Sequence, residues 1–328
     1  MKQLLRTIFA VTVFMPSAAH AQGDAPKKVT VDLAAGAVAQ VRGQYFKMDY
    51  VGGAADADRL IKQFPRAREL AAWRVANLSR ISRPVEAKAA ADALLKADSS
   101  DAWGWFAQAL VLEYAGEGGS NGRELKLGLE AYKRAPNNVD VQWLRTITLS
   151  GAGESAHALA LLDSIAARGP LPSELLVPQA NAMHNTAQKR GMKLDNAKAD
   201  SAFAMYARAT ALDPTDVTSR VFAASRLAGN GRPADAYALA KEGVRLSPLA
   251  LGAHETYWQS IDGLKDRTQA ARDSEVLADV ERLLAARGTE PTVLSAAAYQ
   301  YSAHRRPDRA RELEDKLVAT APTSLMAE

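Results

Sequence analysis

Two stretches of the sequence decide the fold. Residues 201–214 read SAFAMYARATALDP, and residues 233–248 read PADAYALAKEGVRLSP. Each stretch ends in a proline and carries mostly small residues at the positions twelve, eight and five residues before it. These are Ala202, Tyr206 and Ala209 before Pro214, and Ala236, Ala240 and Gly243 before Pro248. Small residues let two helices approach closely, and proline ends a helix because it lacks an N–H. The pattern predicts paired helices whose second member ends near a proline.

The same spacing recurs along most of the chain. Prolines that close alanine-rich segments stand at positions 136, 170, 214, 248, 291 and 322, at intervals of 34, 44, 34, 43 and 31 residues. Self-similarity at such a period indicates stacked repeats, each of which cannot bury its apolar face alone. We therefore expect an all-α chain of about seven helical hairpins: 66–98, 101–135, 139–169, 173–213, 217–247, 250–290 and 293–321.

This pattern resembles the tetratricopeptide repeat family. The first helix of the second hairpin also fits, because Trp103, Phe106, Ala107 and Leu110 follow the large–large–small–large order of that family. The resemblance covers residues 66–322 and implies an α–α superhelix with a concave face. Asp279 and Glu314 depart from the pattern.

Capping signals support the same division. Asn138, Ser173, Asp216 and Thr292 each follow a closing proline closely and are expected to cap the next helix. Glycine-rich turns at 151–153 and 229–231 divide the helices of two hairpins.

The N-terminus has the layout of a secretory signal peptide. A basic start is followed by a short apolar run and by Ala19-His20-Ala21, a small-x-small cleavage site. We expect cleavage after Ala21 and a periplasmic or secreted protein without a later membrane span; the alternative is an amphipathic or buried N-terminal helix.

Residues 22–65 are less clear. Residues 29–33 alternate as a short strand does, and 54–64 read as a helix ending at Pro65. The segment fits either a short irregular lead-in or a degenerate capping hairpin ahead of a repeat domain at 66–328.

Composition argues against several classes of function. Removal of residues 1–21 lowers the net charge from +4 to +2, which is not the basic field that nucleic-acid binding needs. The chain has no cysteine, its histidines lack zinc-site spacing, and no nucleophile elbow occurs. We expect no enzyme activity, no cofactor and no bound metal.

The concave face is the expected binding site. Solenoids bind partners along the surface made by the first helices of their repeats. The resemblance implies these groove positions: Gln108, Trp143, Ile147, Asn181, His184, Val221, Ser225, Glu255 and Gln259. Trp143 is the expected anchor, since tryptophan is enriched at binding hot spots, with ordinary packing as the alternative.

The predicted function is a non-enzymatic scaffold of the periplasm or cell envelope that holds a partner peptide or helix in this groove. Two alternatives remain open. One is an envelope enzyme or accessory factor that acts on peptidoglycan or polysaccharide, with the solenoid as a substrate platform. The other is self-association through hairpin docking.

Overall fold

The computed structural model describes residues 33–81, 83–114, 122–187 and 196–320. The chain divides into residues 1–33, of which only Leu33 is described, and a compact unit of residues 34–328. The signal peptide, its cleavage site and residues 29–32 of the expected strand lie outside the described residues.

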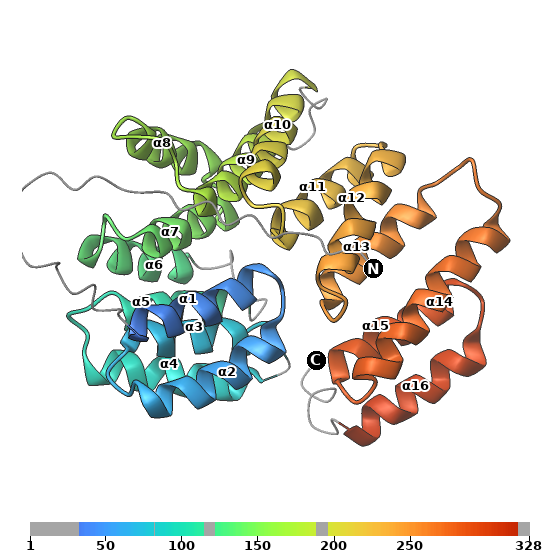
Figure 1. The fold of residues 1–328 in the computed structure, drawn as a ribbon, viewed down its shortest axis with the longest axis horizontal. Helices are drawn as coiled ribbons and strands as arrows, with labels where there is room; N and C mark the ends of the chain where they lie inside the picture. The colour runs from blue at the N-terminus through green and yellow to red at the C-terminus, as the bar shows by residue number, and fades with distance from the viewer. Residues whose placement is uncertain (1–32, 82, 115–121, 188–195, 321–328) are drawn as a thin grey trace, which may run out of the picture. The chain divides into compact units, whose positions relative to one another are not determined.

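The described part of the chain is built from helices, with no strand in it (Figure 1). The sixteen helices are α1 (Leu33–Phe46), α2 (Tyr50–Gln63), α3 (Arg68–Leu78), α4 (Pro84–Ala97), α5 (Trp103–Tyr114), α6 (Arg123–Arg134), α7 (Val139–Gly151), α8 (Ser155–Ala166), α9 (Ser173–Ala187), α10 (Asn196–Leu212), α11 (Val217–Gly229), α12 (Pro233–Leu246), α13 (Leu251–Asp262), α14 (Gln269–Arg287), α15 (Pro291–Ala303) and α16 (Pro307–Thr320).

The seven predicted hairpins are confirmed. They are the successive pairs from α3–α4 to α15–α16. Each second helix from α4 to α14 packs against its own first helix and against the first helix of the next pair. The first helices α3, α5, α7, α9, α11 and α13 also pack on one another in order. This alternation joins the hairpins into an all-α solenoid.

Residues 33–63 are helical. They form α1 and α2, which are separated by a short turn in which Met48 has a positive φ of 59°. The Asp49 side chain caps α2 by accepting a hydrogen bond from the backbone N–H of Gly52 at 3.1 Å. Helix α2 packs on α3 as the second helix of a hairpin would.

The capping signals are confirmed at two of the four predicted positions. Asn138 and Asp216 accept hydrogen bonds from the first turns of α7 and α11. The expectations for Ser173 and Thr292 were wrong, because α9 begins at Ser173 itself and α15 begins at Pro291. Proline has no N–H to leave unpaired, so it suits the first helical position.

The small–large–small pattern marks the helix crossings. Ala202, Tyr206 and Ala209 on α10 are buried, as are Ala236 and Ala240 on α12. Where the pattern fails, the burial differs. In α16 the second apolar position is Leu313, and Glu314, which stands at the expected position, is exposed. In this helix the apolar face is set by residues 310, 313 and 317.

Asp279 is a buried carboxylate at a position where the repeat pattern expects a small residue. Its Oδ2 accepts hydrogen bonds from His254 Nδ1 at 2.6 Å and from Trp258 Nε1 at 2.7 Å. Arg282 donates to Oδ1 at 2.7 Å. A buried carboxylate needs such partners to offset the loss of water. The departure from the pattern therefore joins α13 to α14 by polar contacts.

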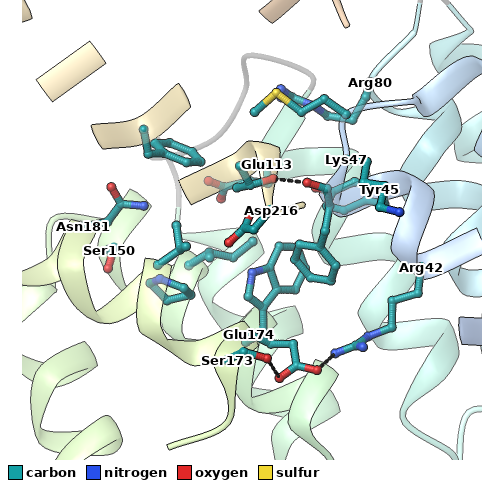
Figure 2. A pocket seen from close by; sticks show the side chains of 18 of the residues that line it. Arg42, Tyr45, Lys47, Arg80, Glu113, Ser150, Ser173, Glu174, Asn181 and Asp216 are labelled. Atoms are coloured by element: carbon teal, nitrogen blue, oxygen red, sulfur yellow. Dashed lines mark hydrogen bonds and ion pairs between the residues drawn. The ribbon is translucent and has the colours of Figure 1, made fainter. Parts of the chain in front are cut away.

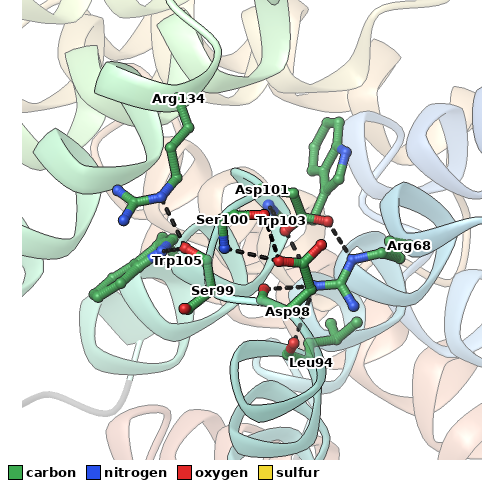
Figure 3. Close-up of polar contacts among 9 residues, drawn as sticks. All are labelled: Arg68, Leu94, Asp98, Ser99, Ser100, Asp101, Trp103, Trp105 and Arg134. Carbon is green, nitrogen blue, oxygen red and sulfur yellow. Dashed lines mark hydrogen bonds and ion pairs between the residues drawn. The ribbon is translucent and has the colours of Figure 1, made fainter.

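The turn between α4 and α5 is held by two arginines from neighbouring hairpins (Figure 3). Arg68 of α3 donates to the carbonyls of Leu94 at 3.0 Å and Asp98 at 2.9 Å, and it pairs with Asp101. Arg134 of α6 donates to the Ser99 carbonyl at 2.9 Å. The two arginines thereby pair the carbonyls of Asp98 and Ser99 just beyond α4 and add a second donor to the Leu94 carbonyl, which also accepts from the Asp98 N–H.

Candidate functional site

The candidate site is the face formed by the first helices, and helix α1 lies on it. Side chains of α1 contact α3, α5, α7 and α9, and the residue that ends α1 contacts α11. A pocket of about 410 Å³ opens beside α1, between it and helices α5, α7, α9 and α11 (Figure 2). We call this face, with its pocket, the groove.

An arginine fixes α1 electrostatically. Arg42 Nε donates to Asp140 Oδ1 of α7 at 2.6 Å, and Arg42 Nη2 donates to Glu174 Oε1 of α9 at 2.8 Å. Asp140 is almost completely buried, and its Oδ2 accepts a hydrogen bond from Trp73 Nε1 at 3.1 Å. Hydrogen bonds between ionised groups are among the strongest in proteins. Arg42 therefore ties the N-terminal helix to two repeats at once.

An aromatic cluster fixes the same helix by apolar contact. The Tyr45 ring lies 5.2 Å from that of Trp73 and 5.7 Å from that of Trp143, measured between centroids. Phe46 packs edge-on to the same two tryptophans, at 5.6 and 5.5 Å. The Tyr45 hydroxyl also shares a hydrogen bond of 2.6 Å with the Tyr114 hydroxyl. Such edge-to-face pairs add to the stabilisation that burial provides.

Two neighbouring carboxyl groups, those of Glu69 and Asp140, form an acidic wall of the groove. Burial, followed by the negative charge of Asp140, raises the pKa of Glu69 to about 7. The two carboxyl groups share a hydrogen bond, which favours a proton on Glu69. Arg42 supplies a positive charge that partly neutralises this wall through its ion pair with Asp140.

The other side of the pocket is polar. Burial and then the charge of Glu124 raise the pKa of Glu113. A Cβ at Gly151 would lie 3.0 Å from the Glu113 carboxylate, so glycine leaves room for this side chain. The Asn181 Oδ1 accepts from the Tyr206 hydroxyl at 2.5 Å. Figure 2 shows Glu113 and Asn181 among the side chains around the pocket.

Three of the predicted groove residues line this pocket: Trp143, Ile147 and Asn181. In the structure Trp143 packs against Tyr45 and Phe46 of the protein's own α1. The other six do not line the pocket. Gln108 donates to Asp92 of α4 at 2.5 Å, and Ser225 is partly buried on α11. Glu255 and Gln259 are exposed on α13.

Two of those six are packing residues. Val221 is buried with Met48 in a small apolar cluster between α11 and the end of α1. His184 is buried, and its Nε2 accepts from Asn230 at 3.1 Å. Burial, followed by the positive charge of Arg226, lowers the pKa of His184 to about 4. The ring is therefore neutral at physiological pH.

The prediction from sequence missed the occupant of the groove. Arg42, Tyr45 and Phe46 fall in the segment whose structure was left open. Their spacing was a usable signal, since residues three and four apart share one helix face. An arginine and two adjacent aromatic residues stand out in a chain with only 6% aromatic residues.

The site is suited to binding. Among the described residues, no group of three or more histidine, aspartate or glutamate side chains is arranged to hold a metal ion. No helix in the described ranges is both long and apolar enough to cross a membrane. What the groove does offer is paired carboxylates beside a cluster of aromatic rings, which can recognise a helix that carries a basic residue and aromatic side chains.

No protein-family model matches the chain, and no curated protein matches it either. Solved structures do. A chain of the APC/C hetero-tetramer Cut9–Hcn1 has a TM-score of 0.56 at 11% identity, covering 91% of this chain; this chain spans 56% of the length of that one. A monomeric IFIT1 mutant with m7Gppp-AAAA has a TM-score of 0.50 at 16% identity, covering 82% of this chain and 67% of that one.

A thermophilic tetratricopeptide repeat protein of Thermus thermophilus, TTC0263, also matches, with a TM-score of 0.34 at 18% identity, covering 62% of this chain and 84% of that one. Cut9 and IFIT1 are themselves tetratricopeptide repeat proteins. The likeness to Cut9, together with the sixteen helices of the described residues, shows that the fold of this chain is a tetratricopeptide-like solenoid. At these identities the likeness concerns the fold alone.

Proposed function

We propose that this protein is a non-enzymatic scaffold that binds a helix or peptide of a partner protein in the groove, and that it does so in the periplasm or cell envelope. One observation carries the binding mode: the groove holds a helix, α1, through an ion-paired arginine and aromatic rings packed edge to face. The location is supported by the signal-peptide pattern of residues 1–21.

The pocket beside α1 leaves contact surface for a partner. Phe222 lines it with 37% of its surface exposed. Aromatic side chains next to polar groups are common anchors at protein interfaces. A partner segment that enters the pocket would meet Phe222 together with Glu113 and Asn181.

Site-specific photocrosslinking tests this function. A benzophenone amino acid replaces Phe222 in the full chain, expressed with its own N-terminus in a Gram-negative host. The matched control replaces Tyr299, another exposed aromatic residue, on α15 and outside the pocket. We expect a defined protein adduct at 222 and none at 299. The same adducts at both positions, or none at either, would refute a groove-binding function.

The location has its own test. Protein released from the periplasm should begin at Gln22, which N-terminal sequencing of the extract would establish. Full-length protein confined to the cytoplasmic fraction would contradict the proposed location and leave the binding function untouched.

A further inference from the structure

Helix α1 is held in the molecule differently from the other helices. Each of the other fifteen described helices runs closely along at least one neighbour, whereas α1 runs closely along none. Its contacts are made chiefly by side chains: those of Arg42, Tyr45 and Phe46, and the buried apolar side chains at positions 37, 38 and 41. The Phe46 carbonyl also accepts a hydrogen bond from Thr218. A Cβ at Gly36 or Gly43 would meet no atom within 4 Å, so these glycines serve no close approach. Helix α1 therefore lies in the groove through side-chain packing, without a close backbone approach to another helix.

By itself, α1 is a weak helix. It has 14 residues, and isolated helices below about 12–15 residues are marginal in water. Its two glycines weaken it further, because glycine loses more backbone freedom than alanine in a helix. Its polar contacts with α2 include those of Gln40 and Gln44, which both donate to Asp56. The groove thus supplies much of what keeps α1 helical.

The groove is complementary to the pattern on α1. Residues 42, 45 and 46 lie at i, i+3 and i+4, on one helix face. The arginine meets the carboxylates of Asp140 and Glu174, and the aromatic pair meets Trp73 and Trp143. The partners in these two ion pairs are 98 and 132 residues apart in the sequence. The surface is made by several repeats acting together.

We propose that α1 is a displaceable intramolecular ligand, and that the external partner is an amphipathic protein helix that presents the same arrangement: a basic residue followed three and four residues later by two aromatic residues. This inference rests on the proposed function and names the chemistry of its partner. When the partner helix binds, it takes the place of α1 on Asp140, Glu174 and the two tryptophans.

Competition within the chain sets the affinity. A tethered ligand acts at an effective concentration in the millimolar range. The apparent affinity for an external helix is lowered in proportion to the fraction of molecules with an open groove. Changes that weaken α1 docking should therefore strengthen partner binding, and changes that stabilise α1 should weaken it.

Cysteine accessibility measures the opening directly. The chain has no cysteine, so a single introduced thiol reports on one position. Val41 on α1 and Val75 on α3 are both 0% exposed, which makes Val41→Cys and Val75→Cys a matched pair. Local opening exposes a segment more often than global unfolding does, so we expect the thiol at 41 to react about tenfold or more faster. Equal rates would overturn the proposal.

Two further changes should move that rate in opposite directions. Arg42→Gln removes both ion pairs and should speed labelling at position 41, while Gly36→Ala should slow it because alanine favours the helix. The rate at position 75 reports global unfolding, and the rate at position 41 should exceed it in both variants. Lys88→Gln, which removes one positive charge from an exposed pair with Asp92 on α4, is the control and should change neither rate.

Binding in trans tests the recognition pattern. The probe is a fluorescent peptide of residues 33–48, followed by anisotropy. The Arg42→Gln chain should bind it about tenfold more tightly than the unmodified chain, because more grooves are open. A peptide carrying Arg42→Gln should bind weakly to both. If the Arg42→Gln chain fails to fold, the Gly36→Ala chain keeps the test decisive by binding more weakly than the unmodified chain.

The outcomes separate this inference from the proposed function. Equal peptide affinity in all chains would overturn the inference. A doubling of the molecular mass in the Arg42→Gln chain would also overturn it, because it would show that a second copy of the chain fills the groove. A protein adduct at position 222 in a chain whose α1 never opens would leave the proposed function standing and remove only this inference.

Discussion

A close approach between neighbouring hairpins gives the sharpest stability prediction. Gly104 on α5 faces the backbone of α4: a Cβ there would lie 2.7 Å from Leu95 Cα and 2.9 Å from Leu95 N. Ordinary contacts between carbon atoms are about 3.5–4.0 Å. Because a backbone cannot rotate away as a side chain can, Gly104→Ala must push α5 from α4 by about 1 Å.

The magnitude follows from two opposing effects. Overpacking of a close crossing costs about 1–3 kcal/mol, and the higher value applies where backbone is the obstacle. Replacing glycine by alanine returns about 0.4–1 kcal/mol through the unfolded chain and helix propensity. We expect Gly104→Ala to lower the free energy of unfolding by about 1–2 kcal/mol, the difference between the two.

Gly43→Ala is the matched control for this substitution. Its Cβ would meet nothing within 4 Å, so only the favourable effect applies. We expect an increase of up to about 1 kcal/mol. Urea titrations followed by circular dichroism at 222 nm measure both variants, with midpoints compared at unchanged slope. A Gly104→Ala chain as stable as the Gly43→Ala chain would refute the close approach of α4 and α5.

Substitutions at three other positions test the core and the carboxyl pair of Glu69 and Asp140. Ala236→Leu should overpack the buried crossing of α12 and lower stability by about 1–3 kcal/mol in a urea titration; a neutral result would place the helix face wrongly. Asp279→Ala should cost about 3–5 kcal/mol by leaving the buried donor of His254 unpaired, whereas Asp279→Asn should cost less in the same assay. Glu69 has its pKa raised from 4.5 to about 7 beside Asp140, so the folded protein keeps a proton that the unfolded chain releases, and stability should fall as pH rises from about 4.5 to 7. Glu69→Gln should remove this fall; urea midpoints at pH 5 and pH 8 that still differ as in the unmodified chain would exclude Glu69 as its source.

The position of α1 changes how the groove is understood. An empty concave face would bind a partner with its full intrinsic affinity. Here the most aromatic part of that face is filled by Tyr45 and Phe46, and its acids are paired with Arg42. The contact surface left for a partner is the pocket beside α1, lined by Phe222 and Asn181.

Part of the candidate site was predictable. Trp143, Ile147 and Asn181 line the pocket because α7 and α9 are first helices, and the resemblance to known repeats identifies the inward positions of such helices. Gln108 does not line the pocket, because its side chain extends to Asp92 on the neighbouring helix. A helix position predicts a face, but a long side chain can turn along that face to a nearby charge.

The sequence by itself determined the hairpins. Alanine-rich segments with small residues at fixed offsets and closing prolines act within one or two helical turns, so their effect needs no knowledge of distant residues. The same local rules explain why Asn138 and Asp216 cap their helices.

Only the tertiary structure decided where α1 lies and what Asp279 does. Arg42 meets Asp140 across 98 residues and Glu174 across 132, and the Phe46 carbonyl accepts from Thr218 across 172. Helix periodicity specifies which side of a helix is apolar, but it does not specify which of several similar surfaces that side will cover. That choice depends on charge and ring complementarity, which exist only once the repeats have stacked.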